Sequence, residues 1–284
     1  MKTGIIGLGA MGLGMARNLA KAGYLTGVYN RTSDKAEALA EELRIKAYPT
    51  QQALAEEVDI VLICVSADQD VLDVVSEIET TIKPGSVVID MSTVSSSTAQ
   101  QAATILKTKQ ADFLDAPVSG GVEGANNGTL AMMVGGDAQA LERVRPILAA
   151  MTARIEHMGA TGAGQACKAV NQIMCAGINQ AVTEALAFAE AQGLNLDKVI
   201  DVVSGGAAGN WFLQHRGKTM TRGIFTPGFK LALHHKDLLI CRRMARQAGV
   251  ACPLTETTLA DYDRLMQQGL GNEDISALYR LKRK

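Results

Sequence analysis

A lysine and an asparagine stand three residues apart in a stretch that is otherwise mostly apolar, CKAVNQIM. On a helix, Lys168 and Asn171 project from the same face. A protonated amine beside a carbonyl oxygen stabilises the negative charge left there by an arriving hydride, and it can donate the proton. Asn171 can position a substrate hydroxyl or carbonyl. The pair predicts hydride-transfer chemistry with Lys168 as the catalytic residue, although a lone helical lysine is more often a solvated surface residue.

Glycines cluster where the first expected strand, TGII, ends. Gly7, Gly9 and Gly12 form G-x-G-x-x-G ahead of an uninterrupted helical stretch. In this arrangement the glycines permit a tight turn, leave room for a pyrophosphate and let the helix pack on the strand. The start of the helix also favours an anion through its N–H groups and dipole. We expect a dinucleotide to bind here, with a purely structural turn as the alternative. The expected cofactor-binding residues of this loop are Gly7, Leu8, Gly9, Ala10, Met11 and Gly12.

The tip of the second expected strand bears on which dinucleotide binds. NAD-binding proteins usually place an acidic residue about 20 residues after the glycines, where it holds the ribose 2′-hydroxyl. This chain instead reads VYNRTSDK, with Asn30, Arg31 and Thr32 at the tip. An arginine can grip a 2′-phosphate that a carboxylate would repel. These residues predict a preference for NADPH, with NAD as a second cofactor; an ordinary surface arginine is the alternative for Arg31.

A third stretch, DAPVSGGVEGANNGTL (115–130), follows another strand end, where ligands of open α/β sheets gather. Ser119, Gly120 and Gly121 supply a hydroxyl and closely spaced N–H groups, which can form an anion-binding nest. A substrate carboxylate is the natural occupant. On this stretch alone, a glycine-rich loop without a ligand is an equal alternative.

The elements that must position these residues alternate up to about residue 160. Apolar runs such as IVLICV predict strands buried on both faces, hence a parallel, doubly wound sheet flanked by helices. From residue 165 to 192 the apolar residues recur at helical spacing without a proline, which predicts one long helix, and no convincing strand follows. The expected fold is α/β: a Rossmann-type NADP-binding domain (1–162), then an all-helical substrate and oligomerisation domain (163–284), joined by this interdomain helix.

The charge and amino-acid composition indicate which kinds of partner this protein is not expected to bind. A formal net charge of −1 provides no global attraction to nucleic acid or acidic membranes, and 47% hydrophobic and 20% charged residues are ordinary for a globular protein. The five cysteines show neither C-x-x-C pairing nor metal-ligand spacing, so no metal site is expected. We expect no signal peptide, and the apolar runs are too short to span a bilayer. We expect a cytoplasmic protein.

Taken together, these motifs resemble the β-hydroxyacid dehydrogenase family, which includes 3-hydroxyisobutyrate dehydrogenase, tartronate semialdehyde reductase and the glyoxylate/succinic semialdehyde reductases. The matching motifs occur in order along the chain: GLGAMGLGMARNLAKAG, DAPVSGGVEGANNGTL, GAGQACKAVNQ and HHKDL. On the substrate side, the resemblance implies Lys168 as the catalytic group, Asn171 as a substrate contact, and Ser119, Gly120 and Gly121 as ligands of the carboxylate.

On the cofactor side, the resemblance implies that Thr93 and Lys236 lie against the nicotinamide end and that Val65 and Ser66 adjoin the adenosine half. It also implies a homodimer or homotetramer. The helical domain is expected to supply a pocket wall, with Trp211 and Phe229 as candidate lining residues. Core packing is an equal alternative for Trp211.

Substrate choice follows from the cofactor. Because Arg31 implies NADPH, and cellular NADPH usually drives reduction, the expected substrate is a small carboxylate-bearing aldehyde such as glyoxylate, succinic semialdehyde or tartronate semialdehyde. The alternative is NAD-dependent oxidation of 3-hydroxyisobutyrate or another 3-hydroxy acid. A non-catalytic nucleotide-binding protein is a more distant alternative, because it has no need of Lys168, Asn171 and the serine–glycine loop together.

Overall fold

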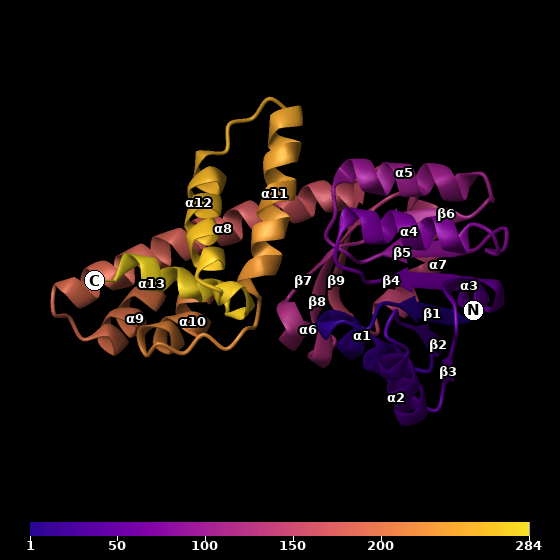
Figure 1. Ribbon diagram of the computed structural model, residues 1–284, viewed down its shortest axis with the longest axis horizontal. Coiled ribbons are helices and arrows are strands. Elements are labelled where there is room, and N and C mark those ends of the chain that lie inside the picture. Colours follow the sequence, from indigo (N-terminus) through magenta and orange to yellow (C-terminus); the bar gives the residue numbers. More distant parts are fainter. Residues whose placement is uncertain (284) are drawn as a thin grey trace. The chain divides into compact units, whose positions relative to one another are not determined.

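The computed structural model describes residues 1–283, which divide after Lys168 into two compact units. Figure 1 shows a sheet flanked by helices in the first unit and helices in the second. The strands are β1 (Thr3–Ile6), β2 (Leu25–Tyr29), β3 (Lys46–Ala47), β4 (Ile60–Ile63), β5 (Val87–Asp90), β6 (Asp112–Asp115), β7 (Val118–Ser119), β8 (Leu130–Gly135) and β9 (Thr152–Gly159). The expected Rossmann-type sheet followed by a helical domain is confirmed.

The helices of the first unit alternate with its strands. They are α1 (Ala10–Lys21), α2 (Ser33–Leu43), α3 (Gln51–Glu57), α4 (Asp68–Ile78), α5 (Ser96–Lys107), α6 (Gly121–Asn127) and α7 (Ala138–Leu148). The remaining elements are α8 (Ala163–Ala191), α9 (Leu196–Ser204), α10 (Trp211–Thr221), α11 (Leu231–Gln247), α12 (Pro253–Gln267), the 3₁₀ turns η1 (Leu270–Asn272) and η2 (Ile275–Leu278), and α13 (Tyr279–Lys282). Helix α8 begins directly after residue 162, and the two units divide inside it, so the predicted domain boundary stays a prediction.

The strand order in the sheet is β3-β2-β1-β4-β5-β6-β8-β7, with β9 paired to β8. Strands β3 to β6 of this order run parallel. The chain leaves β1 for β2 on one side and returns to β4 on the other, which creates the crevice at the strand ends where doubly wound proteins bind nucleotides. Ile6 and Ile63, the last residues of β1 and β4, are partners in register at this crevice.

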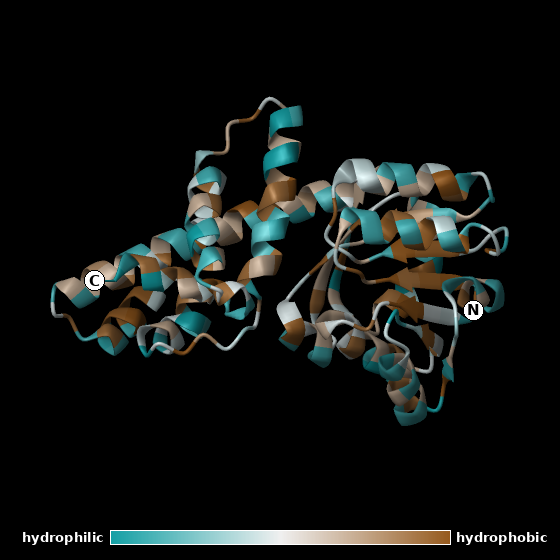
Figure 2. Cartoon of the chain, viewed as in Figure 1, coloured by the Kyte–Doolittle hydropathy of each residue, from teal (hydrophilic) through white to brown (hydrophobic). Residues whose placement is uncertain are grey.

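Both faces of the central strands β1, β4 and β5 are buried, as the apolar strands predict. Ile60 and Leu62 of β4 belong to one hydrophobic core, whereas Val61 and Ile63 belong to another. Successive side chains of a strand point to opposite faces, so the two cores lie on the two sides of the sheet. Figure 2 shows the strands as largely hydrophobic and the outer helix faces as largely hydrophilic.

The expectation of a parallel sheet is wrong at one edge, because β8 runs antiparallel to β6 and β7. A parallel connection needs a crossover of a dozen or more residues, whereas only residues 120–129, containing the short helix α6, separate β7 from β8. The chain therefore returns in the opposite direction. Strand β9, which then pairs parallel with β8, has mostly half-exposed or exposed residues and no apolar run to reveal it in the sequence.

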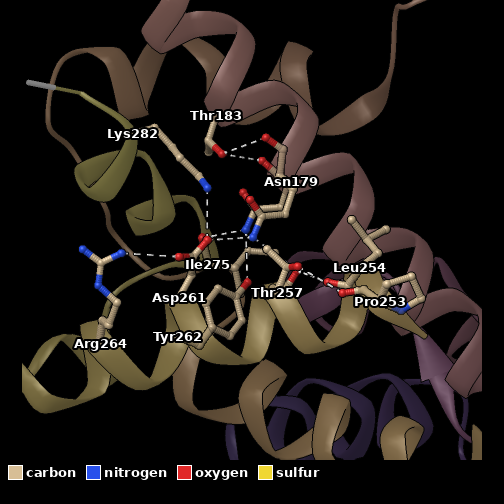
Figure 3. A network of polar contacts seen from close by, with 12 residues as sticks. Asn179, Thr183, Pro253, Leu254, Thr257, Asp261, Tyr262, Arg264, Ile275 and Lys282 are labelled. Carbon is tan, nitrogen blue, oxygen red and sulfur yellow. Dashed lines mark hydrogen bonds and ion pairs between the residues drawn. The ribbon is translucent and has the colours of Figure 1, made fainter. Parts of the chain in front are cut away.

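The second unit packs its helices around a core that contains a buried polar network (Figure 3). Asn179 of α8 donates hydrogen bonds from Nδ2 to the Tyr262 hydroxyl at 3.0 Å and to the Ile275 carbonyl at 2.8 Å. Buried polar groups are tolerated when they are hydrogen-bonded to one another. This network ties α8 to α12 and η2 within the helical unit.

Among the helices of residues 1–283, none combines the length and the apolar character needed to cross a membrane. Within the same residues, no group of three or more His, Cys, Asp or Glu side chains is arranged to hold a metal ion. The predicted cytoplasmic location stays a prediction.

Candidate active site

The three glycines of the glycine loop differ in what a side chain at each position would meet. Gly7 has φ of +99°, and a Cβ placed there would lie 2.2 Å from the Cys64 carbonyl oxygen. A Cβ at Gly12 would lie 2.1 Å from the Gly7 carbonyl oxygen. A Cβ at Gly9, by contrast, would meet no atom within 4 Å. Gly7 and Gly12 are therefore required by packing, whereas Gly9 borders open space that a ligand can approach closely.

The rest of the loop begins helix α1 at Ala10, with Gly9 as N-cap. The N–H groups of a first helical turn have no acceptor within the helix, so they are suited to an anion such as a pyrophosphate. The side chains of Leu8 and Met11 point elsewhere: Leu8 is buried in the core of the sheet and Met11 packs against it. Only the backbone of these two residues is suited to the predicted role, and the loop as a whole fits a dinucleotide.

Asn30 has a structural role in the same loop. Its Oδ1 accepts a hydrogen bond from the Leu8 N–H at 2.9 Å, and its Nδ2 donates to the Thr32 carbonyl at 3.0 Å. The Gly7 N–H donates to the Tyr29 carbonyl at 3.0 Å. These bonds fasten the glycine loop to the end of β2.

The two residues after Asn30 lie at the start of α2. Thr32 is the N-cap of α2. The Arg31 side chain is 91% exposed, and its Nη1 lies 3.7 Å from Oδ1 of Asp70. The guanidinium is therefore accessible beside the end of β2, as its predicted role requires.

Two further turns follow β4 and β5. The Val65 N–H donates to the Ser92 hydroxyl at 2.9 Å, which links the turns. Thr93 is held from both sides, because Gln165 of α8 accepts from the Val94 N–H at 3.1 Å and donates to the Ser92 carbonyl at 2.8 Å. Gln165 is a positioning residue for this turn, and its role depends on contacts that its sequence context does not indicate.

The residues that flank Val65 differ in exposure. Ser66 is exposed, whereas Cys64 is half-buried beneath the glycine loop. Desolvation raises the pKa of the Cys64 thiol to about 12, so the thiol stays neutral and does not repel an anion bound to the loop.

Asp115 anchors the first turn of α8. Its two carboxylate oxygens accept hydrogen bonds from the N–H groups of Gly162, at 2.7 Å, and Gln165, at 2.9 Å. A carboxylate at a helix amino terminus complements the N–H groups and dipole there. Burial raises the pKa of Asp115, and the backbone hydrogen bonds oppose that shift. The sequence motif that contains Asp115 did not indicate this role.

Lys168 projects from α8 towards the predicted carboxylate loop. The side chain is buried, with 7% of the residue exposed, and Nζ donates to the Val118 carbonyl at 2.9 Å. Ser119 follows directly and ends β7, and Gly120 and Gly121 then take φ values of +132° and +63° that favour glycine. The structure thus brings the predicted catalytic lysine to the predicted carboxylate-binding loop.

In the second unit, Asn171 and Lys236 are linked through two buried residues. Asn171 donates from Nδ2 to Gln172 Oε1 at 2.8 Å, and Gln172 donates from Nε2 to Asp237 Oδ2 at 2.6 Å. Lys236 Nζ lies 2.8 Å from Asp237 Oδ1. Gln172 lies in the GAGQACKAVNQ motif and Asp237 in the HHKDL motif, but neither was predicted to be a site residue. We refer to these four residues as the amide–carboxylate chain.

Trp211 and Phe229 are linked through Arg216 and Asp274. Trp211 is 55% exposed and stacks on His215, so the core-packing alternative for this residue is wrong. The Arg216 guanidinium lies 5.2 Å from the Trp211 ring centroid, and its Nε lies 3.5 Å from Asp274 Oδ1. The other oxygen of Asp274 accepts from the Phe229 N–H at 3.1 Å. Arg216 and Asp274 therefore fix the two candidate lining residues relative to each other.

Known protein families match both parts of the chain. Residues 2–159 match the NAD-binding domain of 6-phosphogluconate dehydrogenase, and residues 162–282 match the NAD-binding region of NADP-dependent 3-hydroxyisobutyrate dehydrogenase. The chain belongs to the 3-hydroxyisobutyrate dehydrogenase family. The resemblance to β-hydroxyacid dehydrogenases is thereby confirmed, and the chain is an NAD(P)-dependent oxidoreductase that acts on CH–OH groups of hydroxyacids.

Relatives match along almost the whole chain. A 2-hydroxy-3-oxopropionate reductase of Escherichia coli K12 is 37% identical over 98% of this chain and 96% of its own length. An NAD-dependent L-serine dehydrogenase of Pseudomonas aeruginosa is 33% identical, over 97% of this chain and 96% of its own. The solved structure of Mycobacterium tuberculosis 3-hydroxyisobutyrate dehydrogenase with L-serine superposes with a TM-score of 0.90 at 31% identity and covers 100% of this chain and 99% of that one.

Proposed function

We propose that this protein uses NADPH to reduce a small aldehyde that carries a carboxylate, of the glyoxylate, succinic semialdehyde or tartronate semialdehyde type. The observation that carries the proposal is the buried Lys168 ammonium, which donates to the backbone carbonyl immediately before the Ser119–Gly121 loop. The proposed proton donor and the proposed carboxylate-binding loop are thus adjacent. This is the combination that reduction of a carboxylate-bearing aldehyde requires.

The reaction divides between the bound nicotinamide, which supplies the hydride, and the side chains around the substrate. Lys168 stabilises the alkoxide and gives it a proton. The Ser119 hydroxyl and the N–H groups of Gly120 and Gly121 hold the carboxylate. Asn171 orients the reacting oxygen, and its amide is itself oriented by Gln172. In the oxidation direction the same groups act in reverse, with Lys168 accepting the proton.

The cofactor roles follow the resemblance and the geometry of the first unit. The backbone from Gly7 to Gly12 cradles the pyrophosphate, and Arg31 binds the 2′-phosphate with Asn30 and Thr32 beside it. The exposed guanidinium and the absence of an acidic residue at positions 30–32 support NADPH over NADH. The further cofactor contacts that we propose are Val65 and Ser66 towards the adenosine half, and Thr93 and Lys236 towards the nicotinamide.

Trp211 and Phe229 are proposed to select among substrates by size. Arg216 lies over the Trp211 ring, and Asp274 pairs with Arg216 and accepts from the Phe229 N–H, so the Trp211 side chain and the Phe229 backbone are held in place. Trp211→Ala should therefore change the ranking of substrates more than it changes the affinity for the cofactor.

We also propose that the protein is a homodimer or homotetramer. Helix α8 carries exposed apolar side chains at Val170, Met174 and Phe188, each more than half exposed. These positions recur at helical spacing, so they lie along one stripe of the helix, and a second copy can cover them. Light scattering of the wild-type protein and of Phe188→Glu tests the proposal; an unchanged monomer in both would contradict it.

A substrate panel with both cofactors tests the activity. Oxidation of the reduced nicotinamide is followed with glyoxylate, succinic semialdehyde and tartronate semialdehyde, using NADPH and NADH in parallel. We expect the highest kcat/KM for one of these aldehydes with NADPH. The Arg31→Asp variant should reverse the cofactor ratio, and an unchanged ratio would contradict the assigned role of Arg31.

The second candidate function is NAD-dependent oxidation of a 3-hydroxy acid. It is favoured by the relative named as an NAD-dependent L-serine dehydrogenase and by the 3-hydroxyisobutyrate dehydrogenase structure that contains L-serine. The same assay, run with NAD and 3-hydroxyisobutyrate or L-serine, separates the candidates, because faster turnover there than with any aldehyde and NADPH would favour oxidation.

A further inference from the structure

We infer that Asp70 limits the preference for NADPH over NADH by competing with the 2′-phosphate for Arg31. The inference rests on the proposed role of Arg31 in binding that phosphate. The observation behind it is an ion pair in which Arg31 Nη1 lies 3.7 Å from Asp70 Oδ1. The Arg31 side chain is 91% exposed and the Asp70 side chain is 32% exposed.

The position of Asp70 makes this contact a property of the fold. Arg31 follows β2 and Asp70 lies in the first turn of α4, which follows β4. Strands β2 and β4 both pair parallel with β1, so their carboxyl ends meet at the same edge of the sheet. The acidic group and the arginine therefore belong to the same rim of the predicted nucleotide site.

The start of α4 is also anchored. Asp68, two residues before Asp70, accepts hydrogen bonds from the Ser95 N–H at 2.9 Å and from the Thr98 hydroxyl at 2.6 Å. Asp70 thus projects from a helical turn that is fixed to the neighbouring helix α5. A negative charge is favoured in the first turn of a helix, where Asp70 lies.

The charge on Asp70 acts oppositely on the two cofactors. A phosphate monoester carries about −1.5 to −2 charges at pH 7, so the 2′-phosphate and the Asp70 carboxylate repel each other. The phosphate must therefore either share the Arg31 guanidinium with Asp70 or displace Asp70 from it. The 2′-hydroxyl of NADH is neutral and can donate a hydrogen bond to a carboxylate. Asp70 is therefore an acidic acceptor supplied from α4, whereas NAD-binding proteins usually supply one from the end of β2.

The test is cofactor binding measured by isothermal titration calorimetry with NADP⁺ and NAD⁺ separately. Asp70→Asn removes the charge with almost no change in shape. We expect NADP⁺ to bind about two- to fivefold more tightly, the range of an exposed ion pair, while NAD⁺ binding stays the same or weakens. The gain in NADP⁺ affinity should shrink in high salt, because exposed charges are then screened.

Asp73→Asn is the matched control, because it removes the same charge from the same helix. The Asp73 carboxylate accepts a hydrogen bond from Gln69 of the same helix at 2.7 Å. Equal tightening of NADP⁺ by Asp73→Asn would show a general charge effect and would overturn the inference. An unchanged ratio of the two dissociation constants in Asp70→Asn would also overturn it.

Arg31→Asp separates this inference from the function on which it rests. If Arg31→Asp weakens NADP⁺ binding while Asp70→Asn changes nothing, Arg31 keeps its role and only the inference about Asp70 fails. If Arg31→Asp leaves NADP⁺ binding unchanged, the proposed 2′-phosphate site fails and the inference fails with it.

Discussion

Lys168 and Val118 are joined by a hydrogen bond from the lysine Nζ to the backbone carbonyl oxygen at 2.9 Å, although 50 residues separate them in the sequence. The bond fixes a buried ammonium beside Ser119. Removing the ammonium should remove proton transfer without altering the glycine loop or Arg31. The lysine is therefore expected to matter for turnover and not for cofactor affinity.

Lys168→Ala should abolish turnover in both directions while the dissociation constant for NADPH stays within a few-fold of the wild-type value. Steady-state rates and a fluorescence titration with NADPH measure the two quantities. Lys168→Arg is the control that keeps the charge but changes the shape and pKa of the donor. Retained turnover in Lys168→Ala would contradict the catalytic role.

The three glycines of the loop should separate folding from binding. Gly9→Ala places a methyl group in open space, so it should leave the melting temperature almost unchanged and weaken NADPH binding by at least tenfold. Gly12→Ala places a Cβ 2.1 Å from the Gly7 carbonyl oxygen and should destabilise the fold by about 1–3 kcal/mol, the usual cost of overpacking. Thermal unfolding and NADPH titration of both variants check the contrast, which fails if Gly9→Ala binds NADPH normally.

The amide–carboxylate chain should affect turnover through Asn171 and Lys236. Gln172→Ala breaks the 2.6 Å bond to Asp237 and the 2.8 Å bond from Asn171, so we expect kcat to fall about ten- to a hundredfold. Gln172→Glu, which has the same shape, cannot donate to Asp237 and should not restore the rate, whereas Gln172→Asn should restore part of it. A fall in kcat that tracks only the loss of thermal stability would indicate a purely structural role.

Asp115 should make stability depend on pH. Burial raises its pKa in the folded state, so the folded protein holds this proton to a higher pH than the unfolded chain. The contribution of Asp115 to the free energy of unfolding should therefore decrease as pH rises from about 3.9, the unfolded value, through the raised folded pKa.

Asp115→Asn should remove that dependence. It should also cost about 1–3 kcal/mol at neutral pH, because one backbone N–H of α8 then faces an amide NH₂ instead of a carboxylate oxygen. Urea unfolding at a series of pH values, for the wild type and the variant, measures both effects. Parallel curves for the two proteins would contradict this account of Asp115.

The sequence predicts the parts of the fold that depend on local pattern. Uniformly apolar strands such as β4 indicate burial on both faces, and the long proline-free stretch indicates α8. The reversed strand β8 depends instead on the short connection after β7, and the exposed edge strand β9 lacks an apolar pattern. Neither feature is visible in a window of residues that contains only the strand itself.

The same division holds for the site. The residue types and spacing of Lys168, Asn171 and the glycine loop predict their chemistry from the sequence alone. Gln172 and Asp237 cannot be found that way, since they lie 65 residues apart and only folding brings them to 2.6 Å. The role of Arg31 in binding a 2′-phosphate is predicted from the missing acidic residue at the end of β2. Its partner Asp70 could not be predicted, because it comes from a different βα unit.

Helix α8 has a consequence for building chimeras from relatives of this protein. A crossover placed at residue 162 transfers the first turn of α8 and Lys168 with the new helical part, so the donor's helix start must suit the recipient's Asp115 and its lysine must suit the recipient's Val118. A crossover after Lys168 instead keeps Asp115, Val118 and Lys168 from one parent. It then joins the two parents within α8, between Lys168 and Asn171. Whether a chimera combines the properties of its two parents therefore depends on whether the crossover lies before or after the helical turn that carries Lys168.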